Sequence, residues 1–292
     1  MRTQVIIASI LISVQCAGQG SFSPQAGEPG SNAIPKDYAA FRNWAISCEV
    51  ERGLRQINLP DSGYASSGSA LYAIGKPDAP LTVSLGDGGS ATLTFAAPFY
   101  DGPGYDFAVF ENGFGSGSDA FLELAFVEVS SDGVNFFRFP AISEEQTLSQ
   151  KESFDNSDAT FFHNLAGKHI VNFGTPFDLA DLPDTSALDK QNVTHIKVID
   201  VIGNIDPSFA SVDFNGTIIN DPWPSNFPQG GFDLDAVGVI NSRIPLNVNE
   251  INERNLTSHV KYDLNGKVIS ADRIDSYRGV WISADSKGVK LR

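Results

Sequence analysis

Short apolar runs, separated by turns rich in glycine and aspartate, make up most of the chain between residues 81 and 240. Such runs predict β-strands, because strands are usually about five residues long and are bounded by turn residues. Gly-rich Gly86–Gly89 predicts a hairpin between the first two runs, and Ser131–Gly133 predicts one between the fourth and the fifth. The predicted strands are 81–85, 91–95, 106–112, 121–130, 136–139, 195–202 and 232–240.

One segment has a helical period instead. Within residues 36–47, the positions Tyr38, Phe41, Trp44 and Ala45 recur at intervals that predict one short amphipathic helix. Many short strands with turn signals and few helices predict an all-β protein. We therefore expect a β-sandwich of the jelly-roll type, with one short N-terminal helix and a small C-terminal β-hairpin module.

The predicted strand 232–240 carries two acids within an apolar run. Two acids followed by two valines on one face would make a strand that borders a polar site in its first half and enters the core in its second half. Strict alternation predicts Phe232, Leu234 and Ala236 on one face, and Asp233, Asp235, Val237 and Val239 on the other.

The two ends of the chain differ in composition from the middle. An apolar run of about ten residues at 5–14, behind Arg2, is too short to span a bilayer and is typical of a secretory signal peptide. We expect cleavage after Gly18, with lipidation of Cys16 as the alternative. The expected organisation is a signal peptide at 1–18, a β-sandwich domain at 19–241, a polar linker at 242–255 and a C-terminal hairpin module at 256–292.

The tail predicts a hairpin of its own. Residues 260–269 form two apolar arms around Asn265-Gly266, which is the strongest short hairpin signal. Segments 278–282 and 288–292 predict further strands. The simpler alternative is a structural extra hairpin.

Charge and cysteine content narrow the classes of function. The chain has 20 Lys and Arg against 35 Asp and Glu, a net charge of −15, and no basic cluster, which argues against a nucleic-acid partner. No segment after the signal is long and apolar enough to span a membrane. Once Cys16 is removed with the signal, Cys48 is the remaining cysteine, so we expect no internal disulfide and a buried thiol.

Carboxylates within apolar strands are the strongest chemical signal. Burying such a group is costly unless it is paired or coordinated, and Ca²⁺ is bound by several carboxylate and carbonyl oxygens. The alternative is that these groups accept hydrogen bonds at strand ends. The candidate calcium ligands are Asp106, Asp200, Asp233 and Asp235.

Aromatic and polar side chains near strand ends predict a ligand site. We expect it to use Tyr105, Glu111, Asn112, Phe114 and Trp223, with the aromatic rings stacking on a flat ligand. No metal-binding histidine pair and no Gly-x-Ser-x-Gly motif occurs. The enzymatic alternative is a glycosidase-like hydrolase that uses paired carboxylates from among Glu111, Glu123 and Glu128.

Several segments also resemble known families. Residues 127–136 resemble the strand–turn–strand of galactose-binding-like β-sandwiches, which often carry a calcium ion. A wider set, over residues 21–241, resembles a family of exported Bacteroidetes cell surface proteins of uncharacterised activity: 26–31, 85–93, 106–113, 165–168, 174–179 and 231–237.

The tail resembles the C-terminal sorting domain of the type IX secretion pathway, through its hairpin at 260–269 and Gly279–Ile282. These resemblances imply a protein that is secreted or held on the outer cell surface by the type IX machinery. We expect a non-catalytic binding module for a carbohydrate or for a scavenged nutrient such as a corrinoid.

Overall fold

The structure is a computed structural model that describes residues 19–243 and three short strands beyond them. The chain divides into two compact units, Met1–Arg243 and Ile244–Arg292. The expected signal peptide at 1–18, with Cys16, lies outside the described residues, and so does the expected linker at 242–255 beyond Arg243.

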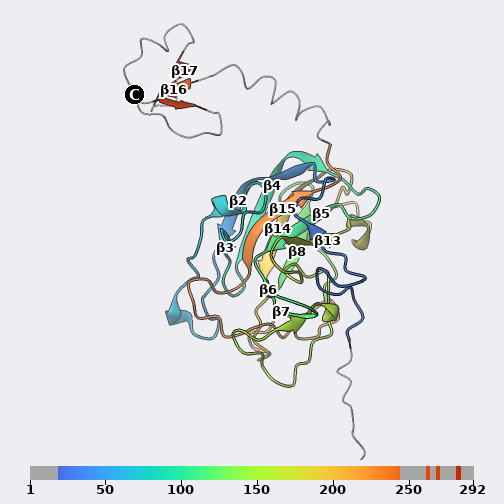
Figure 1. The fold of residues 1–292 in the computed structure, drawn as a ribbon, viewed down its shortest axis with the longest axis vertical. Coiled ribbons are helices and arrows are strands. Elements are labelled where there is room, and N and C mark those ends of the chain that lie inside the picture. The colour runs from blue at the N-terminus through green and yellow to red at the C-terminus, as the bar shows by residue number, and fades with distance from the viewer. Residues whose placement is uncertain (1–18, 244–260, 264–267, 270–280, 284–292) are drawn as a thin grey trace, which may run out of the picture. The chain divides into compact units, whose positions relative to one another are not determined.

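The larger unit is built on a ten-stranded antiparallel sheet that curls on itself (Figure 1). Along the sheet the order is β1-β13-β5-β15-β2-β4-β14-β8-β9, and β3 pairs with β15. The bounds are β1 Ile34–Pro35, β2 Asn43–Glu51, β3 Val83–Ser84, β4 Ser90–Phe99, β5 Phe107–Glu111, β8 Ala125–Ser130, β9 Phe137–Arg138, β13 Phe173–Phe177, β14 Val193–Asp200 and β15 Asp233–Val239.

Short elements complete this unit. Two small sheets pair β11-β7-β6 and β10-β12. Their bounds are β6 Phe114–Gly115, β7 Asp119–Phe121, β11 Ser157–Asp158, β10 Ile142–Ser143 and β12 Phe162–His163. Single 3-10 turns lie at Pro60–Ser62, Ala70–Ala73, Ala159–Phe161 and Leu179–Asp181. Within the described residues, no helix has the length and apolar character needed to cross a membrane.

Strand β2 joins the two halves of the sheet. Its first residues pair with β15 at Asn43 and Trp44, and from Ala45 onward it pairs with β4. The inner faces of both halves meet in one core cluster, which includes Val109 and Val237 from one half and Leu93, Val127 and Ile196 from the other. Full burial of each such side chain stabilises the fold by about 1.5–3 kcal/mol. The prediction of an all-β sandwich is confirmed.

The predicted helix over residues 36–47 is wrong. Two successive turns, in which Tyr38 N donates to Pro35 O and Phe41 N donates to Tyr38 O, lead into β2. Phe41 and Trp44, with ring centroids 4.7 Å apart, both pack on Phe110. The spacing of three residues therefore reflects consecutive turns that place aromatic rings on one side of the sheet, not a helical face.

Of the two hairpins predicted within residues 81–139, one forms. β8 and β9 pair as expected, with Glu128 opposite Arg138. The hairpin between 81–85 and 91–95 is wrong, because β3 pairs with β15 while β4 pairs with β2 and β14. At the Gly-rich turn, Leu85 N donates to Phe232 O and Leu85 O accepts from Gly53 N, so other segments take the bonds that a hairpin needs.

The predicted faces of β15 are also wrong beyond Leu234. The pairing with β5 shifts register between Leu234 and Ala236, which is a β-bulge. After the bulge the alternation reverses, so Val237 and Val239 join Phe232 and Leu234 in the main core cluster. Ala236 instead packs in a separate cluster with Phe110. The two acids therefore do not share a face with the two valines.

In the smaller unit, β16 (Lys261–Asp263) pairs with β17 (Val268–Ile269), with Tyr262 opposite Val268. β18 (Trp281–Ser283) pairs with the other side of β16. The predicted pairing of the two arms is confirmed. The turn at Asn265-Gly266 and the segment 288–292 lie outside the described residues.

Candidate functional site

A pocket of about 360 Å³ opens where the ends of β5 and β15 meet the small sheet and two long loops. We call it the Phe–acid pocket. Its apolar lining is four phenylalanines, Phe114, Phe121, Phe154 and Phe227. Its polar lining is Asn112, Glu123, Ser153, Ser225, Gln229 and Asp233, with the backbone at Gly230.

The four phenylalanines form a continuous row. Phe114 on β6 and Phe121 on β7 are cross-strand partners and stack with centroids 4.8 Å apart. Phe154 lies 5.8 Å from Phe121 and 5.7 Å from Phe227. Phe114, Phe154 and Phe227 are 57%, 67% and 41% exposed. A contiguous exposed apolar surface of this kind is typical of binding sites.

In the same pocket, Asp233 is held in place at the first position of β15. Its Oδ1 accepts from the Ser84 hydroxyl, and its Oδ2 accepts from Asn112 Nδ2 at 3.1 Å. Asn112 follows directly after β5, so the pairing of β5 with β15 brings the two side chains together. Burial raises the pKa of Asp233, although these hydrogen bonds and Arg52 act in the opposite direction.

Two glutamates adjoin Asp233. Glu111, the last residue of β5, is 1% exposed; its Oε2 accepts from Gly113 N at 2.6 Å and its Oε1 has no partner. Glu123 is half-buried and lines the pocket. In residues 19–243, no hydrogen bond or ion pair engages the Glu123 carboxylate. Burial, and then repulsion from Asp233, raises the pKa of both glutamates well above the usual value.

Two further acids lie within electrostatic range. Asp200 accepts from Phe232 N at 2.7 Å and from Gly88 N at 2.9 Å, and its pKa is raised well above normal by burial. Asp221 Oδ2 accepts from Leu124 N at 2.9 Å, its Oδ1 has no partner, and burial raises its pKa to about 8. We call Glu111, Glu123, Asp200, Asp221 and Asp233 the buried acidic cluster.

Few cations act on this cluster. Arg52 lowers the pKa of Asp233 by charge attraction, but its guanidinium donates to the carbonyls of Ser67, Gly68 and Ser84. Lys151 lowers the pKa of Asp221 but is itself paired with Glu145 at 3.1 Å. The cluster therefore keeps an excess of acidic groups over cations.

The predicted ligand residues are only partly brought together. Asn112 and Phe114 line the Phe–acid pocket, and Glu111 lies beside them in the chain. Trp223 is in the loop that supplies Ser225, and its Nε1 donates to Asp87 Oδ2 at 3.1 Å. Tyr105 lies elsewhere: it lines a second pocket, of about 420 Å³, together with Tyr38.

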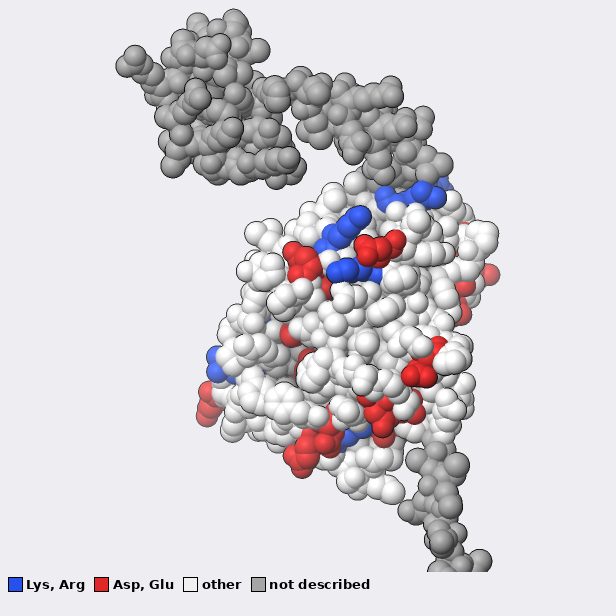
Figure 2. All heavy atoms as spheres, viewed as in Figure 1, with Lys and Arg blue, Asp and Glu red and all other residues white. Residues whose placement is uncertain are grey.

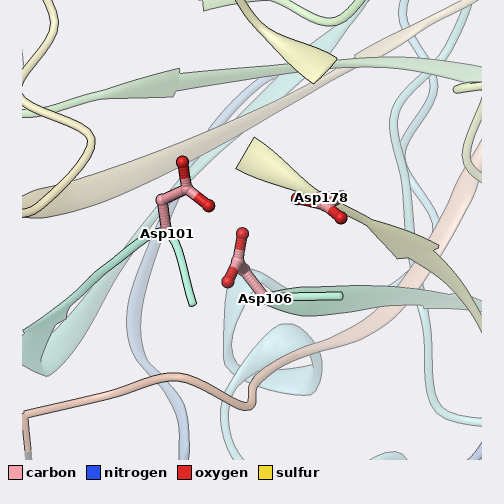
Figure 3. A group of neighbouring side chains, drawn as sticks. All are labelled: Asp101, Asp106 and Asp178. Atoms are coloured by element: carbon pink, nitrogen blue, oxygen red, sulfur yellow. The ribbon is translucent and has the colours of Figure 1, made fainter. Parts of the chain in front are cut away.

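The predicted metal ligands are distributed over different surroundings. Asp106 belongs to a group with Asp101 and Asp178 in which one carboxylate oxygen from each lies within 4.8 Å of the others. Figure 3 shows these three carboxylates turned toward one another, from the end of β4, the start of β5 and the end of β13. Asp200 and Asp233 belong to the buried acidic cluster. Asp235 accepts from Asp78 N at 3.0 Å through Oδ1, while its Oδ2 has no partner.

The three-aspartate group fits a cation only in part. Asp106 Oδ1 accepts from Gly102 N and from Asn241 Nδ2, and its Oδ2 accepts from Leu179 N, at 2.7–2.9 Å. Most of its lone pairs are therefore used. Since Ca²⁺ takes about six to eight oxygen ligands, water would have to fill most of the coordination shell.

Of the three glutamates predicted as candidates for hydrolysis, one lies away from the Phe–acid pocket and two lie at it or beside it. Glu128 is paired with Arg138 at 2.9 Å and is not part of the pocket lining. Glu111 and Glu123 lie near Asp233, and after burial and repulsion from Asp233, repulsion from Glu111 further raises the pKa of Glu123. The sequence did not identify Phe121, Phe154 and Phe227 as pocket residues. For the last two, the sequence signal that could have indicated a binding site was a phenylalanine within a polar loop, as in Ser153-Phe154-Asp155 and Asn226-Phe227-Pro228.

The Phe–acid pocket has two kinds of lining group, aromatic rings and polar side chains, and each determines part of its chemistry. Flat apolar rings contact apolar ligand surface, while the carboxylates and the amide of Asn112 accept or donate hydrogen bonds. On the face drawn in Figure 2, charged side chains are interspersed with uncharged surface and form no continuous basic patch.

A scan against protein-family models and a search of curated proteins find no match to this chain.

Proposed function

We propose that this chain is a non-catalytic ligand-binding module, secreted or displayed on the outer cell surface, that binds a small carbohydrate. The observation that carries the proposal is that a row of phenylalanine rings lines the same pocket as Asn112, Glu123 and Asp233. A sugar ring presents an apolar face for stacking and hydroxyl groups around its edge for hydrogen bonding. The pocket offers partners for both.

Pocket size narrows the ligand. Small-molecule pockets usually occupy about 300–1,000 Å³, so a volume of about 360 Å³ is near the lower limit. This supports one or two sugar rings as the occupant. A scavenged corrinoid is the alternative ligand, but its macrocycle needs a wider site than this one.

The test is binding to the mature protein, measured by thermal shift over a panel of mono- and disaccharides and then by calorimetry. A bound sugar should raise the melting temperature, because it stabilises the native state. Phe154→Ala should weaken binding by about fivefold, since stacking contributes about 1 kcal/mol. The matched control is Phe214→Ala, a phenylalanine 74% exposed outside the Phe–acid pocket. Equal binding by both variants would contradict the proposal.

A second candidate function is glycoside hydrolysis. It is favoured by the presence of Glu123 and Asp233 in one pocket and by the raised pKa of Glu123, which suits a general acid. Release of reducing sugar from the bound disaccharide, abolished by Glu123→Gln, would support it. Binding without turnover over prolonged incubation would leave the non-catalytic module as the function.

A stabilising calcium ion is a separate part of the proposal, supported by the convergence of Asp101, Asp106 and Asp178. A chelator should then lower the melting temperature, and millimolar calcium should restore it. Asp101→Asn should reduce that response, because Asp101 is the least engaged of the three carboxylates. An unchanged melting temperature, with no metal found by elemental analysis, would reject the ion.

A further inference from the structure

We propose that the Phe–acid pocket selects ligands that carry a positively charged amino group, and that its carbohydrate is therefore an amino sugar. This inference rests on the proposed function and names the ligand class of the same pocket. It follows from the charge of the lining, from the acids left without partners and from the arrangement of the rings.

The lining is acidic without any basic counterpart. Glu123 and Asp233 both contribute side chains to the pocket, and no Lys, Arg or His is among the residues that line it. An anionic ligand, or one rich in carboxylate or phosphate groups, would meet repulsion from both acids. A cationic ligand would meet attraction, strengthened by the low polarity of a partly enclosed, ring-lined space.

Behind the lining, buried acidic oxygens lack the partners that would offset their burial. Glu111 Oε1 and Asp221 Oδ1 have no hydrogen-bond partner. The carboxylate of Glu123 has none among the residues of the larger unit that the structure describes. Removing a charged group from water costs several kcal/mol unless it is paired. An ammonium group in the pocket would pair with Glu123 and Asp233, the acids that line it, and its binding would favour their ionised form.

The rings provide the second half of an ammonium site. A cation over the face of an aromatic ring is attracted by the ring quadrupole, by about 0.5–1 kcal/mol at exposed sites and more when water is excluded. Phe114, Phe154 and Phe227 all expose part of their surface along the pocket. Rings and carboxylates that line the same pocket suit an organic ammonium group attached to an apolar skeleton.

A bare metal ion is less well suited to this pocket. In the described part of the chain, the acidic group whose oxygens converge within 4.8 Å is Asp101, Asp106 and Asp178, which shares no residue with the buried acidic cluster. In that part of the chain, no three acids of the buried acidic cluster converge in this way, whereas a bare metal ion needs several oxygen ligands around one point. This arrangement matches a larger cation, with its charge at one end and a ring to stack.

The experiment compares three disaccharides of glucose-type units with the same β-1,4 linkage, which differ at carbon 2. They carry a hydroxyl (cellobiose), an acetamide (N,N′-diacetylchitobiose) or a free amine (chitobiose). Phenethylamine serves as an amine without a sugar. Dissociation constants are measured by calorimetry at low and moderate salt. We expect the free amine to bind at least about tenfold more tightly than cellobiose, with a preference that shrinks as salt is added.

Variants assign the preference to the pocket. Glu123→Gln should reduce the preference for chitobiose over cellobiose to within about threefold, because it removes one of the two acids that line the pocket. The matched control is Glu51→Gln, which removes the same charge from an exposed position on β2. It should leave the preference unchanged.

Every other result of these measurements overturns either the amine preference, the carbohydrate ligand or the assignment to this pocket. Equal binding of the three disaccharides would overturn the amine preference and leave the carbohydrate proposal standing. Binding of phenethylamine but of no sugar would uphold the amine site and overturn the carbohydrate. A preference that survives both Glu123→Gln and Asp233→Asn would overturn the assignment to this pocket, and binding of no probe would overturn both proposals.

Discussion

At the scale of single residues, Asp221 illustrates how the buried acidic cluster links protonation to stability. Its pKa rises from the usual 3.8 to about 8, because burial opposes its charge and only one of its oxygens accepts a hydrogen bond. The folded state therefore retains a proton that the unfolded chain releases near pH 4. This stabilising contribution is complete below about pH 4 and is lost as the pH rises through 8.

We predict that Asp221→Asn raises the free energy of unfolding at pH 8 by at least about 1 kcal/mol relative to the original protein, with little difference at pH 4. Asparagine has nearly the shape of the protonated acid but cannot ionise. Urea unfolding at the two pH values measures the change. The control is Asp37→Asn at an exposed position. A gain that is the same at both pH values would contradict the electrostatic explanation.

Lys168 affects the pH dependence of stability in the opposite direction. Its ammonium is 2% exposed and donates to Ser23 O, Ser23 Oγ and Phe162 O, none of which is charged. Burial lowers its pKa from 10.5 to about 8. Between those values the unfolded chain binds more protons than the folded one, so this residue makes stability rise with pH from about 8 to 10.5.

We predict that Lys168→Met removes this rise, which amounts to about 3 kcal/mol for a shift of this size. Cys48 acts in the opposite direction, because burial raises its pKa from 9.0 to about 12. The comparison is therefore made in a Cys48→Ala background, by urea unfolding at pH 8 and at pH 10.5. Parallel pH dependences in the two proteins would show that Lys168 is not the responsible group.

Sequence reasoning identified part of the pocket at this scale. Asn112, Phe114 and Asp233 were recognisable because a polar or aromatic residue interrupts or ends an apolar strand. Their meeting was not predictable, since Asn112 and Asp233 are 121 positions apart and are joined by strand pairing. Phe154 and Phe227 lie in polar loops, where no periodic pattern indicates which way a ring points.

At the scale of elements, β15 depends on the tight turn that precedes it. Gly231 has φ +73°, and a Cβ there would lie 2.7 Å from Asp200 Oδ1 and 2.8 Å from the backbone of Gly86. The segment also carries Gly230, which lines the Phe–acid pocket. Close approach of three chain segments therefore requires glycine at position 231.

We predict that Gly231→Ala destabilises the protein by more than about 3 kcal/mol, from strain at positive φ plus the clash. Gly216→Ala is the matched control: its φ is +82°, but nothing lies within 4 Å of the added Cβ. It should cost only about 1 kcal/mol. Thermal or urea unfolding measures both, and similar losses in the two variants would mean that backbone strain alone is responsible.

The elements that sequence reasoning placed correctly were those with strong local signals. β8 and β9, like β16 and β17, are separated by only a few residues in the sequence, so each pairing is local. The pairing of β3 was not predicted, because its partner, β15, is about 150 residues away in sequence. The bulge in β15 was not predictable for a related reason, since it depends on the register of β15 with β5. Local chemistry predicts strands and turns, but not the distant partner that completes the hydrogen bonding.

At the scale of the whole molecule, the all-β class was predictable from the density of short apolar runs and turns. The order of strands in the sheet was not, because it depends on which buried faces pack best over the entire unit. The result is a unit that contains its own core: all three apolar core clusters lie between residues 34 and 240. This organisation leads to a prediction about the smaller unit.

We predict that deleting residues 244–292 leaves a folded binding module that fails to reach the cell surface. Arg243, the last residue kept, still donates through its backbone N to Pro98 O at 3.1 Å and lies over the ring of Tyr100. The melting temperature and the affinity for sugar should therefore stay within error of the full-length values. Surface delivery should be lost under the hypothesis that this tail, whose sequence resembles a type IX sorting domain, acts as the sorting signal. Protease accessibility on intact cells measures delivery, and attaching residues 244–292 to an unrelated periplasmic protein should bring that protein to the surface. If the truncated chain is delivered normally, the smaller unit is a structural extension and the sorting hypothesis is wrong.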